Sequence, residues 1–116
     1  DDQASRDFLR RILIKKDWRV HEASDGVRGL GLMKRLLPRL VVLDLLMPEM
    51  DGFQTLSEMQ QTPELQNIPV VVVTSKDLSM NELEWLRDRA VAVVTKGANS
   101  RSQLVKALER QISAAE

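Results

Sequence analysis

The chain has 116 residues, the length of a single domain. Its 17 basic residues balance its 17 acidic residues, so charge gives no reason to expect binding to nucleic acid or to an anionic membrane. The absence of cysteine excludes disulfides, thiolate metal sites and cysteine nucleophiles within these residues. The longest apolar runs are far shorter than the roughly 20 residues that span a bilayer. Because the chain opens on Asp1 and Asp2 without a basic, signal-like segment, we expect a cytoplasmic domain.

Hydrophobic spacing divides the chain into alternating helices and strands. Apolar residues recur with helical spacing in the first helix, and short β-branched runs indicate the strands. In chain order, the predicted elements are a helix at 5–16, a strand at 18–23, a helix at 25–37, a strand at 40–43, a helix containing Phe53, Leu56 and Met59, a strand at 70–73, a helix at 79–89, a strand at 91–94 and a helix from Ser100 onward.

This alternation predicts an α/β fold with a doubly wound parallel sheet and helices on both faces. Only four strands are found, and a helix follows the two opening acids almost directly. We therefore expect residues 1–116 to be one domain of the flavodoxin-like type, with five strands in the order 2-1-3-4-5 and the first strand missing from this segment. About five apolar residues upstream of Asp1 would supply that central strand.

The most informative single residue is Asp44, which ends the apolar run Leu40-Val41-Val42-Leu43. Such a run is typical of a strand buried on both faces. A lone carboxylate is costly to bury, so the residue needs a cation nearby. Open α/β sheets place their ligands at the carboxyl ends of their strands, which is where Asp44 is expected.

Other polar residues are expected at the same edge of the sheet. Thr74 and Lys96 follow the later strands, and Asp1 and Asp2 would follow the missing one. Oxygen ligands without histidine or cysteine favour a hard ion such as Mg²⁺. A carboxylate beside Mg²⁺ and a lysine is a plausible nucleophile toward phosphorus.

These residues carry a resemblance that covers the whole chain. The sequence resembles response-regulator receiver (CheY-like) domains in four pieces, which occur in order and at the right spacing: Asp1-Asp2, Leu43-Asp44-Leu45-Leu46-Met47-Pro48-Glu49-Met50-Asp51-Gly52, Val73-Thr74-Ser75 and Thr95-Lys96. The residues themselves assign Asp51-Gly52 to a turn and helix start rather than to chemistry.

The resemblance implies a role for each matching residue. Asp44 is implied as the phosphoacceptor, Thr74 as the switch hydroxyl and Lys96 as the ammonium that contacts the phosphate. The implied cofactor is Mg²⁺, and its implied ligands are Asp1, Asp2, Asp44 and the backbone carbonyl of Leu46.

Two departures from the family pattern affect the expected switch. Gly97 follows Lys96 where many receivers have a proline, and Val93 stands where the last strand usually carries an aromatic residue. Because Val93 replaces the aromatic residue, we expect a smaller rearrangement of the surface formed by residues 79–116 than in a chemotaxis-type receiver. The segment from Lys96 to Arg101 is similar to receivers fused to hybrid sensor kinases.

Three functions compete at this point. The first is a phosphoacceptor signalling domain whose partner is a histidine kinase or a histidine phosphotransfer domain, and which exists as a monomer or a weak dimer through residues 79–116. Catalysis by such a domain is limited to its own phosphorylation and slow dephosphorylation. The second is a phosphatase of the haloacid dehalogenase type, which Leu46 opposes because a second acid is required at that position. The third is a pseudo-receiver that only binds proteins.

Overall fold

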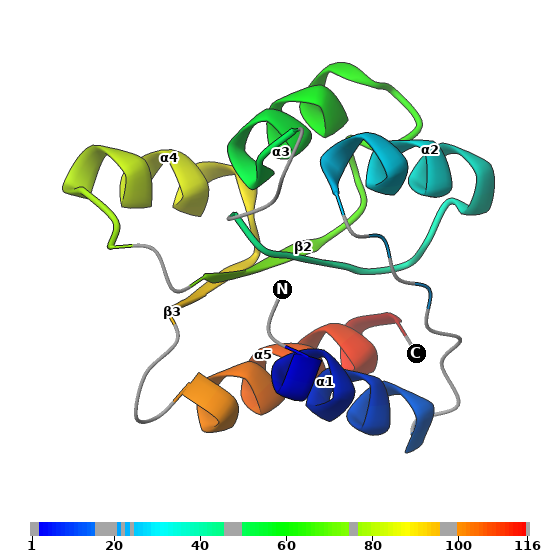
Figure 1. Ribbon diagram of the computed structural model, residues 1–116, viewed down its shortest axis with the longest axis vertical. Helices are drawn as coiled ribbons and strands as arrows, with labels where there is room; N and C mark the ends of the chain where they lie inside the picture. The colour runs from blue at the N-terminus through cyan, green and yellow to red at the C-terminus, as the bar shows by residue number, and fades with distance from the viewer. Residues whose placement is uncertain are drawn as a thin grey trace.

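A computed structural model describes residues 3–15, 21, 23, 25–45, 50–74, 77–95 and 100–115. Within these residues, five helices surround three strands (Figure 1). In chain order the elements are α1 (Gln3–Lys15), α2 (Gly26–Leu36), β1 (Val41–Leu43), α3 (Gly52–Gln61), β2 (Val70–Thr74), α4 (Met80–Arg89), β3 (Ala92–Thr95) and α5 (Ser100–Ala115).

The described strands form one parallel sheet in the order β1-β2-β3. Val41 pairs with Val70 between the first two strands, and Val71 pairs with Ala92 between the second and third. The central strand β2 is buried along its whole length, as its unbroken β-branched sequence predicts. All three strands end at the same edge of the sheet, because parallel strands share one direction.

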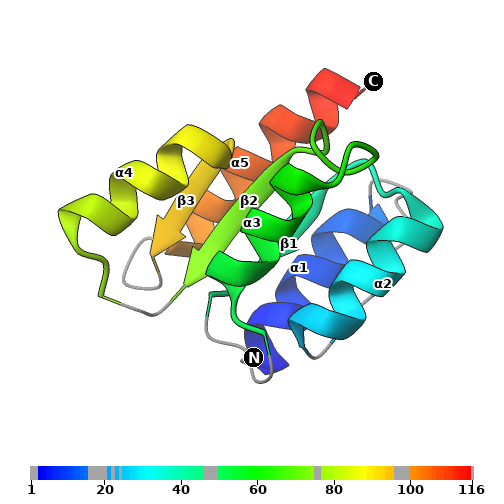
Figure 2. The same ribbon diagram turned by 90° about the horizontal axis from the view of Figure 1, so that it is seen from above.

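Helices cover both faces of the sheet. Helices α2, α3 and α4 lie on one face, and α1 and α5 lie on the other (Figures 1 and 2). Each face has its own apolar cluster. The first cluster contains Leu30, Met33, Val41, Leu43, Leu56, Met59, Val70, Val72 and Leu86, and the second contains Val71, Val73, Val94, Leu104 and Leu108. Alternate residues of β2 thus point to opposite faces and join the two layers.

Local signals in the sequence explain where several helices begin and end. Asp51 and Ser79 each form a reciprocal capping box at the start of α3 and α4. Asp25 caps α2, accepting a hydrogen bond from the Arg28 backbone N–H at 2.8 Å. Leu37 follows the last residue of α2 as its C-cap, in a left-handed conformation directly before Pro38.

The predicted fold class is confirmed, and most element boundaries agree within one or two residues. The strand predicted at residues 18–23 is described only at His21 and Ala23, and neither residue lies in a strand. The prediction does not hold at these two positions, where the alternation of apolar and polar residues is weak. The rest of that range lies outside the described residues, and the strand expected upstream of Asp1 stays a prediction.

The helices in the described ranges are each too short or too polar to cross a membrane.

Candidate functional site

The carboxyl edge of the sheet holds two of the residues singled out by the sequence. Asp44 directly follows β1 and is half-buried between Leu43 and Leu45, which are almost fully buried. Thr74 is the last residue of β2, and its side chain is completely inaccessible to solvent. A carboxylate and a hydroxyl therefore occupy the ends of two neighbouring strands.

The strand register brings these positions together. Leu43 pairs with Val72, so the next step along both strands places Asp44 level with Val73, one residue before Thr74. Neighbouring strands lie about 4.8 Å apart. Thr74 pairs in turn with Thr95, the exposed last residue of β3. The edge predicted from the sequence is thus present across all three described strands.

Four predicted site residues lie outside the described part of the chain. These are Asp1, Asp2, Leu46 and Lys96. Lys96 directly follows Thr95 in the sequence, at the end of β3. The metal and phosphate roles of all four residues stay predictions.

The start of α3 packs against the backbone of Asp44. The Gly52 N–H donates a hydrogen bond of 3.1 Å to the Leu45 carbonyl oxygen. A Cβ atom on Gly52 would lie 2.6 Å from the Leu45 Cα and 2.7 Å from the Asp44 carbonyl oxygen, closer than real contacts allow. Only glycine permits this approach, so residue 52 helps to fix the strand end that carries Asp44.

This contact gives Gly52 a role that sequence reasoning missed. The sequence analysis assigned Asp51-Gly52 to a turn and helix start. Asp51 does cap α3, since its Oδ1 accepts a hydrogen bond of 2.9 Å from the Gln54 N–H. The close approach of Gly52 to Asp44 could not be read locally, although an Asp-Gly pair soon after a buried strand was the available signal.

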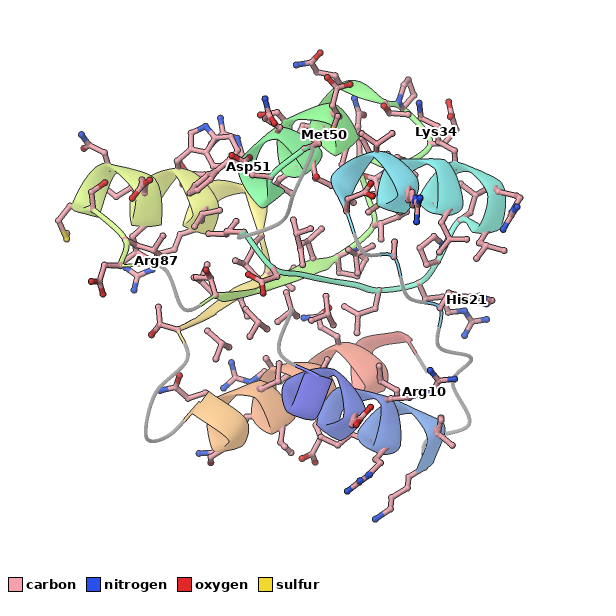
Figure 3. The ribbon with its side chains drawn as sticks, viewed as in Figure 1. Arg10, His21, Lys34, Met50, Asp51 and Arg87 are labelled. Atoms are coloured by element: carbon pink, nitrogen blue, oxygen red, sulfur yellow. The ribbon has the colours of Figure 1, made fainter. Side chains whose placement is uncertain are left out.

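The described residues contribute part of the predicted metal site. Among them, no three His, Cys, Asp or Glu side chains cluster in a way that could hold an ion. Asp44 nevertheless offers carboxylate oxygens at a half-buried position, and such oxygens fit a hard cation. His21 is exposed and lies far from Met50 and Asp51 in Figure 3.

Fold and site together define a class of protein, and comparison with known proteins identifies the family. The family model of the response regulator receiver domain matches residues 1–109. The chain belongs to this family, whose members act in two-component signalling.

Two curated relatives illustrate the range of proteins in which such domains occur. The chain is 38% identical over 77 residues to the response regulator MprA of Mycobacterium sp. (strain KMS), which covers 66% of this chain and 33% of that protein. It is 32% identical over 99 residues to histidine kinase P4 of Formosa agariphila, which covers 85% of this chain and 7% of the kinase. The chain thus spans a third or less of the length of these relatives.

Solved structures agree with the fold. The phosphorylated cyanobacterial phytochrome response regulator RcpA superposes with a TM-score of 0.82 at 25% identity, covering 100% of this chain and 91% of that one. The Mn²⁺-bound form of response regulator Rcp1 gives a TM-score of 0.72 at 26% identity, covering 94% of this chain and 86% of that one.

Proposed function

We propose that this domain accepts a phosphoryl group on Asp44 from a phosphohistidine of a partner protein. A carboxylate oxygen of Asp44 forms the new bond to phosphorus as the bond from phosphorus to the imidazole nitrogen breaks. The nitrogen keeps the electron pair of that bond. The observation that carries the proposal is the half-buried Asp44 at the end of β1, beside the buried Thr74 at the end of β2, in a chain of the receiver family.

Thr74 and Lys96 are proposed to bind the transferred group. Thr74 ends the strand next to Asp44, and its hydroxyl can donate a hydrogen bond to a phosphoryl oxygen. Lys96, directly after β3, would neutralise part of the added negative charge. Such preorganised donors stabilise the charge that spreads over the oxygens during transfer.

Asp1, Asp2, Asp44 and the Leu46 carbonyl are proposed to hold Mg²⁺. All four supply oxygen, the ligand type that Mg²⁺ prefers. When bound, the ion neutralises charge on the phosphoryl oxygens. The Mn²⁺-bound Rcp1 structure supports a divalent ion in a receiver of this fold.

The partner is proposed to be a histidine kinase or a histidine phosphotransfer domain in the cytoplasm. Such a protein supplies the phosphohistidine that the reaction consumes. The similarity to histidine kinase P4 supports a hybrid kinase as the longer protein that contains this domain. A net charge of zero favours a protein partner over nucleic acid.

The test measures phosphoryl uptake from a small phosphodonor, with and without Mg²⁺, in three proteins. The wild type and Asp51→Asn are expected to take up label, because asparagine preserves the cap of α3 and Asp51 has no part in the transfer. Asp44→Ala is expected to take up none. Label retained by Asp44→Ala, or lost in Asp51→Asn while the protein stays folded, would contradict the assignment of Asp44. A folded wild type that takes up no label would leave a pseudo-receiver as the better explanation.

A further inference from the structure

The first turn of α2 lies against the segment that leads into α3. Helix α2 begins at Gly26, which is buried. A Cβ atom on Gly26 would collide with the Thr55 Oγ1, and would lie 2.5 Å from the Met50 carbonyl oxygen and 2.9 Å from the Met50 Cβ. Glycine is needed at this position because there is no room for a side chain. Its backbone conformation does not require glycine, since Gly26 is not in the left-handed region.

The other two glycines of α2 have no such contact. A Cβ on Gly29 would meet only the Ala23 Cβ at an ordinary 3.7 Å, and one on Gly31 would meet nothing within 4 Å. The close approach is therefore specific to Gly26.

Met50 and Thr55 connect Gly26 to the acceptor. The Thr55 Oγ1 is buried and donates a hydrogen bond of 2.8 Å to the Asp51 carbonyl oxygen. Asp51 caps α3, and the next residue, Gly52, lies against the backbone of Asp44 and Leu45. A continuous series of side-chain and backbone contacts thus runs from the first turn of α2 to Asp44.

We propose that Gly26 is a positioning residue for phosphoryl transfer, holding Met50 and the start of α3 so that the strand end carrying Asp44 keeps its place. The proposal rests on the proposed function of Asp44. The atoms nearest to Gly26 are the Thr55 Oγ1, the backbone carbonyl oxygen of Met50 and the Met50 Cβ, all close to the main chain, so an added methyl group must displace Met50 or Thr55. A small displacement of a reacting group is enough to slow a transfer step markedly.

The test compares Gly26→Ala with two controls on the same helix. Gly31→Ala adds the same methyl group in open space. Met33→Ala removes a buried side chain of α2 and so destabilises the domain without adding an atom beside Met50 or Thr55. Each protein is measured for its urea midpoint and for the rate of phosphoryl uptake at saturating phosphodonor and Mg²⁺.

We expect uptake by Gly26→Ala to slow by about tenfold or more. Gly31→Ala and Met33→Ala should keep the wild-type rate, even though Met33→Ala is less stable. The double variant Gly26→Ala/Thr55→Ala should recover part of the rate, because it removes one of the colliding atoms. A wild-type rate in Gly26→Ala, or an equal slowing in Met33→Ala, would overturn the proposal.

Two further measurements keep the test decisive. If Gly26→Ala does not fold, Asp25→Ala replaces it, because loss of this cap frays the same turn without adding an atom. Uptake by Asp25→Ala at the wild-type rate would then overturn the proposal.

Amide chemical shifts of residues 44, 45 and 50–52, recorded without phosphodonor, are expected to move in Gly26→Ala and not in Gly31→Ala. These shifts judge the positioning role even if the wild type takes up no phosphoryl group, which would contradict only the proposed function.

Discussion

Single residues near the acceptor show how closely backbones pack at this end of the sheet. Because Gly52 has no side chain, the first turn of α3 packs closely against the Asp44 carbonyl oxygen. The Gly52 N–H donates a hydrogen bond to the Leu45 carbonyl oxygen. The two atoms nearest to a Cβ on Gly52 are backbone atoms, so they cannot move aside as a flexible side chain would. The identity of residue 52 therefore matters for both stability and the position of Asp44.

Gly52→Ala is expected to lower the free energy of unfolding by about 1–3 kcal/mol, the cost of overpacking a well-packed site. It is also expected to slow phosphoryl uptake, because the strand end that carries Asp44 must shift. Urea unfolding and uptake kinetics measure the two effects, with Gly31→Ala as the control that adds a methyl group in open space. A variant as stable and as active as the wild type would show that the contact is unimportant.

Leu37 is strained for a different reason. It adopts a left-handed conformation with φ of 48° at the end of α2, and its side chain is 54% exposed. A leucine is unfavourable there because its Cβ crowds the following carbonyl, whereas glycine has no Cβ.

Leu37→Gly is expected to raise the free energy of unfolding by about 0.5 kcal/mol, since relief of strain exceeds the entropy that glycine adds to the unfolded chain. Leu36→Gly, one residue earlier and still helical, is the matched control and should lower it by about 1 kcal/mol. Chemical denaturation distinguishes the two. A loss of stability in Leu37→Gly would mean that the leucine side chain contributes more than its conformation costs.

At the scale of elements, α3 and α4 begin with the same device. Ser79 and Glu82 exchange hydrogen bonds of 3.0 and 3.1 Å between side chain and backbone. Asp51 and Gln54 make the equivalent pair of 2.9 and 3.3 Å. These caps set the first residues of the two helices that lie between the acceptor strand and β3.

Asp51→Ala and Ser79→Ala are each expected to lower the free energy of unfolding by about 1 kcal/mol, the usual cost of losing a helix cap. Asp51→Asn and Ser79→Asp keep a side-chain oxygen acceptor and should retain nearly all of the stability. Thermal or urea unfolding measures the four variants. If the alanine variants equal the wild type, the caps do not stabilise these helices.

The elements also show what a sequence can and cannot predict here. The helix predicted at 79–89 and the strand predicted at 70–73 follow from local patterns, and the structure confirms both. Asp44 and Thr74 were placed at one edge because parallel topology follows from alternation. The contacts of Gly26 and Gly52 were not predictable, because they join residues that are distant in the chain or lie on separate elements.

At the scale of the whole molecule, the carboxyl edge of the sheet, which carries Asp44, adjoins the surface formed by α4, β3 and α5. The two regions meet at the ends of the strands. Trp85 of α4 lies 5.8 Å from the ring of Phe53 at the start of α3, and the Arg89 guanidinium stacks 4.1 Å above the Trp85 ring. Val93 of β3 packs half-buried against the apolar cluster beneath α4. Helix α4 is therefore anchored to the start of α3, while β3 presents a small aliphatic side chain on that face.

A beryllofluoride phosphate mimic is expected to change amide chemical shifts mainly in residues 79–116, with smaller changes than in receivers that carry an aromatic residue at the Val93 position. Thr74 and Lys96 would draw the adjoining segments toward the added oxygens. Thr74→Val keeps the shape of the buried side chain but removes its hydroxyl, so it should confine the changes to the vicinity of Asp44. Changes confined to that vicinity in the wild type would contradict the proposed coupling.

The central claim is that Asp44 alone receives the phosphoryl group. The most direct measurement is to phosphorylate the wild-type protein with a small phosphodonor and Mg²⁺, digest it under mildly acidic conditions, and locate the acyl phosphate by mass spectrometry. We predict a single modified peptide with the added mass on Asp44. An added mass on any other residue, or none at all on a folded, Mg²⁺-saturated protein, would contradict the account.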